Sequence, residues 1–242
     1  MHFDLDPIML DRTKKYFTKG KNLRDKLRYQ EIIIETLMLE ISKSEDPYEL
    51  FKFIVENKEI SCSRNYSDLV ALFYLGKNKR YLEIGAGEPI IGSDTFLLEQ
   101  EMQWTGIQVE PDLQTFKKLQ MTRTDSVQLN AAVIGDADKS EYFLNPYTMR
   151  LSKQKKNFKQ IKTINMHDIK TLNTKFDALF IDVEGNELNI ISSKSFLDFN
   201  FKFINIEMIW NNSQIYDILS GYGYKQVGAS FSSYSGWFIK DF

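Results

Sequence analysis

The stretch Leu82-Glu83-Ile84-Gly85-Ala86-Gly87 joins an apolar strand to two closely spaced glycines. Glycine has no Cβ, so backbone N–H groups in such a turn can come close to a ligand. In an open α/β sheet, ligands bind at the carboxyl ends of the strands, which is where this turn lies. Two glycines also occur in many ordinary tight turns. The residues that follow the neighbouring strands therefore decide what this turn binds.

Strands and helices alternate from Lys79 onward. Ala178-Leu179-Phe180-Ile181 is wholly apolar, which is typical of a parallel strand covered on both faces. The pattern predicts one α/β domain over residues 79–242. We expect helices over 93–103 and 112–121. The expected strands are 80–84, 106–109, 127–129, 141–144, 178–181, 203–206, 224–227 and 237–239.

Residues 1–78 have helical signals only and predict an N-terminal helical extension. A second helix is expected to start at Asp46-Pro47-Tyr48-Glu49, and a third to run from Ser67 or Asp68 to Gly76. This extension could cap the substrate site, mediate a homodimer or complete the core. The first helix is indicated by apolar residues at helical spacing, namely Leu23, Leu27, Ile34, Met38 and Ile41.

Bulk properties narrow the class of protein. The chain has 242 residues and a formal net charge of −2, so no overall field favours nucleic acid as a partner. A single cysteine, Cys62, excludes a disulfide framework and a cysteine-rich zinc site. The start has no secretion-signal pattern, and the apolar stretch 32–41 is too short and too charged to span a bilayer. We expect a cytoplasmic protein.

The spacing of the glycines bears on the ligand. A dinucleotide-binding turn carries a third glycine three residues after the second, but position 90 is Ile90 and the next glycine is Gly92. This favours a nucleoside that carries an amino acid. Glu110 lies 23 residues after Gly87, where a carboxylate can accept hydrogen bonds from both ribose hydroxyls. The alternative is that Glu110 merely precedes a helix start.

Two further strand ends carry polar groups. Asn130-Ala131 follows the third strand, and small residues beside an amide would admit an adenine ring, although an ordinary turn is equally consistent. Asp182, Glu184 and Glu187 follow the strand 178–181. Neighbouring acids tend to raise a pKa, which suits a carboxylate for accepting a hydroxyl proton. Alternatively, Glu184 and Glu187 only begin the next helix.

Taken together, the region from about Asn65 to the end resembles the FkbM-type methyltransferases, a class I methyltransferase family. The string Phe180-Ile181-Asp182-Val183-Glu184-Gly185-Asn186-Glu187 is the most specific match. The other matching strings, in chain order, are Tyr81 to Gly87, Gly92-Ser93-Asp94-Thr95, Trp104 to Pro111, Leu129 to Val133 and Phe203 to Glu207.

The resemblance implies a Rossmann-like fold with a seven-stranded, mostly parallel sheet. Its last strand would be antiparallel and lie beside the sixth, with Trp237-Phe238-Ile239 as the candidate. It also implies methyl transfer from S-adenosyl-L-methionine to a hydroxyl oxygen, often on a sugar, a glycan or a glycosylated metabolite.

The resemblance also assigns roles to residues. Glu83, Gly85 and Gly87 would meet the amino-acid end of the cofactor, and Glu110 would hold its ribose. We count Asp94, Asn130, Ala131 and Asp182 as further cofactor contacts, and Asp182 and Glu184 as catalytic. The family often carries Asn at the position of Asp94. The segment Ser63-Arg64-Asn65-Tyr66-Ser67-Asp68 also departs from the family pattern, which puts contacts from it in doubt.

Several alternatives stay open from the residues alone. Asp182 or Glu184 is expected to orient or deprotonate the acceptor, whereas His167 fits a surface histidine better than a base. We assign no metal ligand, although Asp182, Glu184 and Glu207 could together hold a hard cation. A non-catalytic cofactor-binding subunit and, less favoured, a nicotinamide-dependent oxidoreductase are the rival functions. Six basic residues in 150–162, without an acid, indicate either a lid for a phosphorylated acceptor or a solvated insertion.

Overall fold

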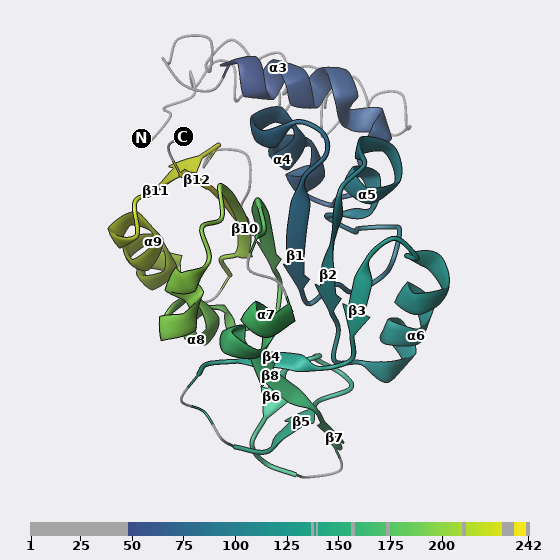
Figure 1. Cartoon of the computed structure of the whole chain (residues 1–242), viewed down its shortest axis with the longest axis vertical. Coiled ribbons are helices and arrows are strands. Elements are labelled where there is room, and N and C mark those ends of the chain that lie inside the picture. The colour runs from purple at the N-terminus through teal and green to yellow at the C-terminus, as the bar shows by residue number, and fades with distance from the viewer. Residues whose placement is uncertain are drawn as a thin grey trace, which may run out of the picture. The chain divides into compact units, whose positions relative to one another are not determined.

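The computed structural model describes residues 48–136, 138, 140–155, 158–172, 175–209, 212–228 and 235–240 (Figure 1). The chain divides into two units, Met1–Lys52 and Phe53–Phe242, and only residues 48–52 of the first are described. The expected helix containing Leu23 to Ile41 lies outside the described residues, as do Asp46 and Pro47. That helix, a homodimer formed through it and a domain boundary at residue 79 stay predictions.

The seven-stranded sheet expected from the sequence is present. Its strand order is β11-β12-β10-β9-β1-β2-β3. β12 is antiparallel to both of its neighbours, and the other pairs are parallel. The last strand thus lies beside the sixth, as predicted, and pairs with the fifth on its other side. The strands are β1 (Arg80–Ile84), β2 (Thr105–Val109), β3 (Val127–Leu129), β9 (Ala178–Ile181), β10 (Phe203–Glu207), β11 (Tyr224–Val227) and β12 (Ser235–Lys240).

Helices cover the sheet because alternate strand residues point to opposite faces. Leu82 and Ile84 of β1 belong to the large apolar cluster that includes residues of α7, α8 and α9. Tyr81 and Glu83 point to the other face, toward Glu99 of α5 and Thr95 just before it. The helices are α3 (Tyr48–Asn57), α4 (Ser67–Leu75), α5 (Phe96–Met102), α6 (Leu113–Thr122), α7 (Met166–Leu172), α8 (Glu187–Ile191) and α9 (Asn212–Gly221), with 3-10 turns η1 (Lys58–Ile60) and η2 (Lys194–Asp198).

Two small sheets lie beyond the carboxyl edge of the main sheet, at the lower end of Figure 1. β4 (Ala132–Ile134) pairs in parallel with β8 (Thr163–Asn165). β5 (Tyr142–Leu144) is antiparallel to both β6 (Leu151–Ser152) and β7 (Lys159–Ile161). The sequence did not predict β4, β6, β7 or β8. These strands have two or three residues each, too few for an alternating pattern to stand out.

Other differences from the predicted elements are local. The helix expected over 93–103 begins only at Phe96. Ser93 precedes the helix, and its Oγ accepts the N–H of Phe96, the first helical residue. His167 lies in α7, on its exposed side, in agreement with the surface position that the sequence favoured. The third helix matches its prediction and ends at Gly76, whose φ is +70°. Among the described residues, no helix is long and apolar enough to cross a membrane.

Candidate active site

The glycine turn after β1 is held against the end of β9. Gly85 has φ +83°, and a Cβ placed on it would stand 1.7 Å from the Asp182 carbonyl oxygen. Its N–H donates to the Val109 carbonyl at the end of β2 (2.9 Å). Both the left-handed backbone and the lack of space require glycine here. The ends of β1, β2 and β9 therefore converge on one point.

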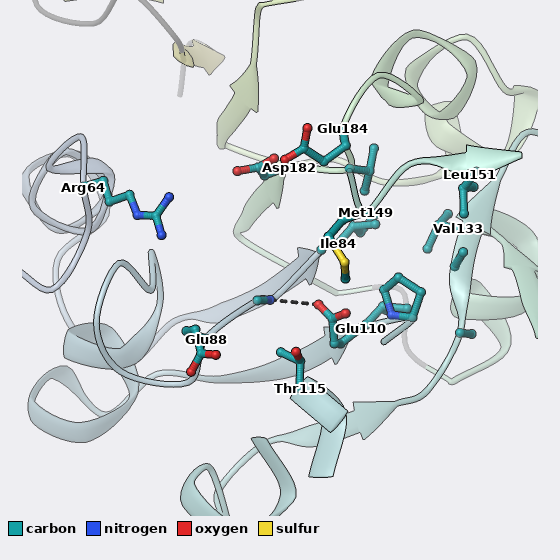
Figure 2. Close-up of a pocket in the computed structure, with 17 residues that line it drawn as sticks. Arg64, Ile84, Glu88, Glu110, Thr115, Val133, Met149, Leu151, Asp182 and Glu184 are labelled. Atoms are coloured by element: carbon teal, nitrogen blue, oxygen red, sulfur yellow. Dashed lines mark hydrogen bonds between the residues drawn. The ribbon is translucent and has the colours of Figure 1, made fainter. Parts of the chain in front are cut away.

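A cavity of about 370 Å³ opens at this point (Figure 2). Its walls come from the ends of β1, β2 and β9, from β4, and from the loop and strand 149–151. Several predicted site residues line it: Gly85, Gly87, Glu110, Ala131, Asp182 and Glu184. The remaining lining residues are Arg64, Ile84, Glu88, Val109, Pro111, Thr115, Ala132, Val133, Met149, Leu151 and Val183.

Glu110 is fixed at the cavity wall by backbone donors. Its Oε2 accepts the Gly87 N–H (2.9 Å, the dashed line in Figure 2), and its Oε1 accepts the Asp112 N–H (2.7 Å). Burial raises its pKa above the ordinary value. The side chain of Asp112, not that of Glu110, caps α6 by accepting from Gln114 and Thr115. Glu110 is thus not needed as a helix cap, and its remaining lone pairs are available to a ligand.

The acidic turn after β9 is rigidly held. Glu184 has φ +57°, an uncommon conformation for a residue with a side chain. Buried Glu187 supports it, because its Oε1 accepts the N–H groups of Val183 (3.0 Å) and Gly185 (3.1 Å). Glu187 therefore serves the turn, whereas the Asp182 and Glu184 carboxyls stand side by side at the cavity edge (Figure 2).

These acids alter one another's ionisation. Desolvation by surrounding protein, together with the charges of Glu184 and Glu187, raises the pKa of Asp182 to about 6, and Arg64 opposes the rise. Glu207, at the end of β10, is 8% exposed. Its burial, followed by the charges of Asp182 and Glu187, raises its pKa to about 8. The edge of the cavity is therefore strongly acidic and only weakly balanced by positive charge.

Three residues predicted to contact the cofactor do not line the cavity. Glu83 is buried on the opposite sheet face, where its Oε2 accepts from Thr95 (2.8 Å) and Gln108 (2.7 Å). Asp94 accepts from Ser63 (2.5 Å) and Asn205 (2.7 Å). The Asn130 amide donates to the carbonyls of Glu110 (2.9 Å) and Pro111 (3.1 Å). All three support the loops that surround the cavity.

Arg64 is the main site residue that the sequence did not single out. The segment 61–68 is tied to the Asp68 carboxylate, which accepts from Ser61 Oγ (2.6 Å) and the Cys62 N–H (2.8 Å). Arg64 then crosses over Gly92, where a Cβ would meet its Nε at 2.8 Å. In Figure 2 it faces the cavity from the side opposite Val133 and Leu151. In the sequence, only the departure of residues 63–68 from the family pattern pointed to Arg64.

A second cavity, of about 520 Å³, adjoins the first. Leu151, Val183 and Glu184 line both cavities. The second is lined further by side chains that can donate or accept hydrogen bonds: Tyr142, Arg150, Lys153, Asn186 and Asn189. Of the basic residues in 150–162, Arg150 and Lys153 thus reach a cavity, and Lys159 lies in β7. His167 lines neither cavity.

Residues 83–225 match the model of the methyltransferase FkbM domain. The chain belongs to the FkbM methyltransferase family. Its methyl donor is S-adenosylmethionine, which removes the nicotinamide alternative. No curated protein matches the sequence of this methyltransferase.

Several solved structures that resemble it are methyltransferases of low sequence identity. A TehB-like S-adenosylmethionine-dependent methyltransferase from Corynebacterium glutamicum is 7% identical, with a TM-score of 0.44 over 81% of this chain and 100% of that one. The Burkholderia thailandensis 1,6-didemethyltoxoflavin-N1-methyltransferase is 10% identical (TM-score 0.41; 88% and 90% covered). Podospora anserina PaMTH1 is also 10% identical (TM-score 0.39; 98% and 89% covered). These structural similarities do not identify the methyl acceptor of this chain.

Proposed function

We propose that this methyltransferase transfers the methyl group of S-adenosylmethionine to a hydroxyl oxygen of a sugar, a glycan or a glycosylated small metabolite. The observation that carries the proposal is the position of Glu184, which lines both cavities, with Asp182 beside it on the wall of the first. An acceptor in the second cavity would present its nucleophile at that shared edge. A cofactor in the first cavity would present its methyl group there.

The first cavity suits the parts of the cofactor in a definite order. Glu110 is proposed to hold the ribose hydroxyls, and the small residues Ala131 and Ala132 leave room beside Val133 for adenine. The amino-acid end would then lie near Gly85 and Gly87. This order places the sulfonium between the ribose site and the Asp182–Glu184 edge.

The proposed reaction is an in-line displacement, in which the acceptor oxygen forms a bond to the methyl carbon as the carbon–sulfur bond breaks. The sulfur keeps the bonding electron pair and leaves as neutral S-adenosylhomocysteine. The enzyme contributes chiefly by aligning the two reactants. Asp182 or Glu184 would orient the hydroxyl and receive its proton. Both side chains already stand at the edge where the two reactants would meet.

The side chains of the second cavity support a hydroxyl-rich acceptor. Asn186 and Asn189 offer amide donors and acceptors, and Tyr142 offers a hydroxyl. The Asn186 amide already donates to the Val133 carbonyl (2.9 Å), which fixes its orientation. Polar groups held in place in this way select a ligand by its hydrogen bonds.

The same cavity supports the proposal that the acceptor carries a phosphate or another acidic group. Arg150 and Lys153 line it, and Lys153 is paired with Asp138 (2.8 Å) at an exposed position. If these cations bind the acceptor, its affinity falls as salt concentration rises. An affinity independent of salt would remove the acidic group from the proposal and leave a neutral sugar.

The experiment is transfer of a labelled methyl group to fractionated extracts of the source cell. We expect label in carbohydrate-containing material, recovered as an O-methyl sugar after acid hydrolysis. Label on nitrogen or carbon, or label confined to protein, would contradict the proposal. S-adenosylhomocysteine binding, measured in parallel, shows whether a negative result reflects a missing acceptor or an inactive preparation.

A further inference from the structure

Three carboxylates that follow or end two neighbouring strands lie close together beside the two cavities. Asp182 and Glu184 follow β9, and Glu207 ends β10. One oxygen from each lies within 4.8 Å of the other two. β9 and β10 are neighbours in register, with Ile181 opposite Ile206. The sheet itself therefore brings the third acid to the first two.

The burial of Glu207 is a second observation, independent of the proximity of the three carboxylates. It is 8% exposed, and its Oε2 is buried without a hydrogen-bond partner in the part of the chain that the structure describes. A buried carboxylate oxygen normally has a partner, because leaving it unpaired is unfavourable. One oxygen of this buried side chain is also among the three that lie within 4.8 Å of one another.

The surroundings provide little positive charge. Arg64 is the basic group that acts on Asp182, and no basic group acts appreciably on Glu207 among the described residues. A proton shared with Glu187, which contacts Glu207, could neutralise that one pair. It would leave the Asp182 and Glu184 oxygens facing the same point. A divalent cation would satisfy all three carboxylates together.

We propose that Asp182, Glu184 and Glu207 bind one hard divalent cation such as Ca²⁺, Mn²⁺ or Mg²⁺. Carboxylate oxygens are the ligands that such ions prefer. Two oxygens bound to one Ca²⁺ lie at most about 5 Å apart and two bound to Mg²⁺ at most about 4.2 Å, given their usual bond lengths. Each pair of oxygens in the cluster, within 4.8 Å, is close enough to share one Ca²⁺. The exposed Asp182 and Glu184 side chains can close in on a smaller ion.

The cation has a chemical consequence that rests on the proposed function. It would lie at the shared edge, where an acceptor hydroxyl could complete its coordination. A bound divalent ion lowers the pKa of a coordinated hydroxyl and fixes its position. Asp182 and Glu184 would then act on the acceptor through the ion, while their second oxygens stay free to take the proton.

The test is titration of the full chain with Mn²⁺, followed by electron paramagnetic resonance, without cofactor or acceptor. We expect one saturable site, competed by Mg²⁺ or Ca²⁺. The substitutions Asp182→Asn and Glu207→Gln should each weaken Mn²⁺ binding ~10-fold or more. Asp198→Asn is the matched control, because Asp198 is an exposed acid that is paired with Lys170 (2.8 Å) and is not part of the cluster, and it should bind as wild type.

Two results would overturn the proposal: no saturable binding up to about 1 mM Mn²⁺, or wild-type affinity in both cluster variants. Circular dichroism checks folding, and if Glu207→Gln is unfolded, Asp182→Asn and Glu184→Gln at exposed positions decide the matter. Since no cofactor or acceptor is present, absence of Mn²⁺ binding leaves the methyl-transfer proposal intact. Conversely, label on the wrong acceptor atom leaves the metal site intact.

Discussion

The Cα of Gly85 faces the Asp182 backbone so closely that a Cβ would stand 1.7 Å from the Asp182 carbonyl oxygen. The Asp182 N–H in turn donates to the Ile84 carbonyl (3.0 Å). The glycine turn and the proposed catalytic turn are therefore one packed unit. A change in one is transmitted to the other.

Gly85→Ala is expected to disrupt both turns. Gly76→Ala is the matched control, because Gly76 also has positive φ (+70° against +83°) but would meet nothing within 4 Å. The control should lose about 1–3 kcal/mol of unfolding free energy from backbone strain alone. Gly85→Ala should lose more and should also lose S-adenosylhomocysteine binding. Denaturant unfolding and calorimetry measure the two effects, and equal losses for both variants would contradict the packing interpretation.

Glu110→Gln should weaken cofactor binding. Glu110 accepts two backbone N–H groups, and an amide nitrogen in place of one oxygen leaves one of them without an acceptor. Loss of charge-assisted hydrogen bonds to ribose, at about 1.5–3 kcal/mol each, predicts ~10-fold weaker binding or more. Glu101→Gln, at an exposed position in α5, is the control. Calorimetry with S-adenosylhomocysteine decides, and unchanged affinity would exclude Glu110 as the ribose ligand.

Asp182→Ala should abolish turnover while cofactor affinity stays within a few-fold of wild type. The side chain stands at the acidic edge, whereas Gly85 meets the backbone of the residue, which alanine retains. Transfer of labelled methyl groups and calorimetry measure the two properties separately. Asp198→Ala should change neither. Undiminished turnover in Asp182→Ala would remove this carboxylate from the mechanism.

Arg123, which is buried against Glu99 and Thr95, is expected to be essential for the stability of the fold. Its guanidinium is fully buried and pairs with buried Glu99 (3.0 Å), and it also donates to Thr95 Oγ1 (2.8 Å). Removing one partner of such a pair typically costs 3–5 kcal/mol, so Arg123→Met should lower the unfolding free energy by about that much. The double variant with Glu99→Gln should recover part of the loss. No recovery would show that the pair's charges are not coupled.

Asp94 should make stability depend on pH. Burial, with the charges of Glu83 and Asp68, raises its pKa from 3.8 to about 8. The folded protein therefore keeps a proton that the unfolded chain releases near pH 4. The contribution of Asp94 to stability falls as pH rises between these values, by up to ~1.4 kcal/mol per pH unit.

Asp94→Asn removes this dependence. Its amide can still accept from Ser63, and Asn205 Oδ1 is buried without a hydrogen-bond partner among the described residues, so it can receive the new N–H after a flip. The unfolding free energy of Asp94→Asn relative to wild type should rise from about pH 4 to about pH 8 and then level off. Denaturant unfolding across that range measures it, with Asp198→Asn following wild type. A constant difference would mean that Asp94 is already ionised.

Much of the site followed from the order of residues along the chain. Gly85, Gly87, Glu110 and Asp182 were expected together, and all four line one cavity. Each comes directly after a strand of a parallel sheet, so its position is implied once the strands are recognised. The carboxyl ends of such strands lie at the same edge.

The differences between the expected and the observed cavity residues also have physical explanations. Glu83 was expected to face the cofactor, but side chains alternate along a strand, and β1 already turns Ile84 and Leu82 toward one face. Glu83 points to the other face, where Gln108 and Thr95 hold it. Leu151 lines the cavity from β6 and Met149 from the loop before it, and the two- and three-residue strands of this small sheet carry no readable pattern.

The sequence by itself determined the parallel α/β sheet, the glycine turn after β1 and the acids that follow β9, because these depend on patterns a few residues long. Only the tertiary structure decided which separate segments meet at the glycine turn. It placed Arg64 across the cavity from Val133, joined the turn to the Asp182 carbonyl and brought Glu207 to Asp182 and Glu184. Such contacts depend on strand order and side-chain direction, which no local pattern encodes.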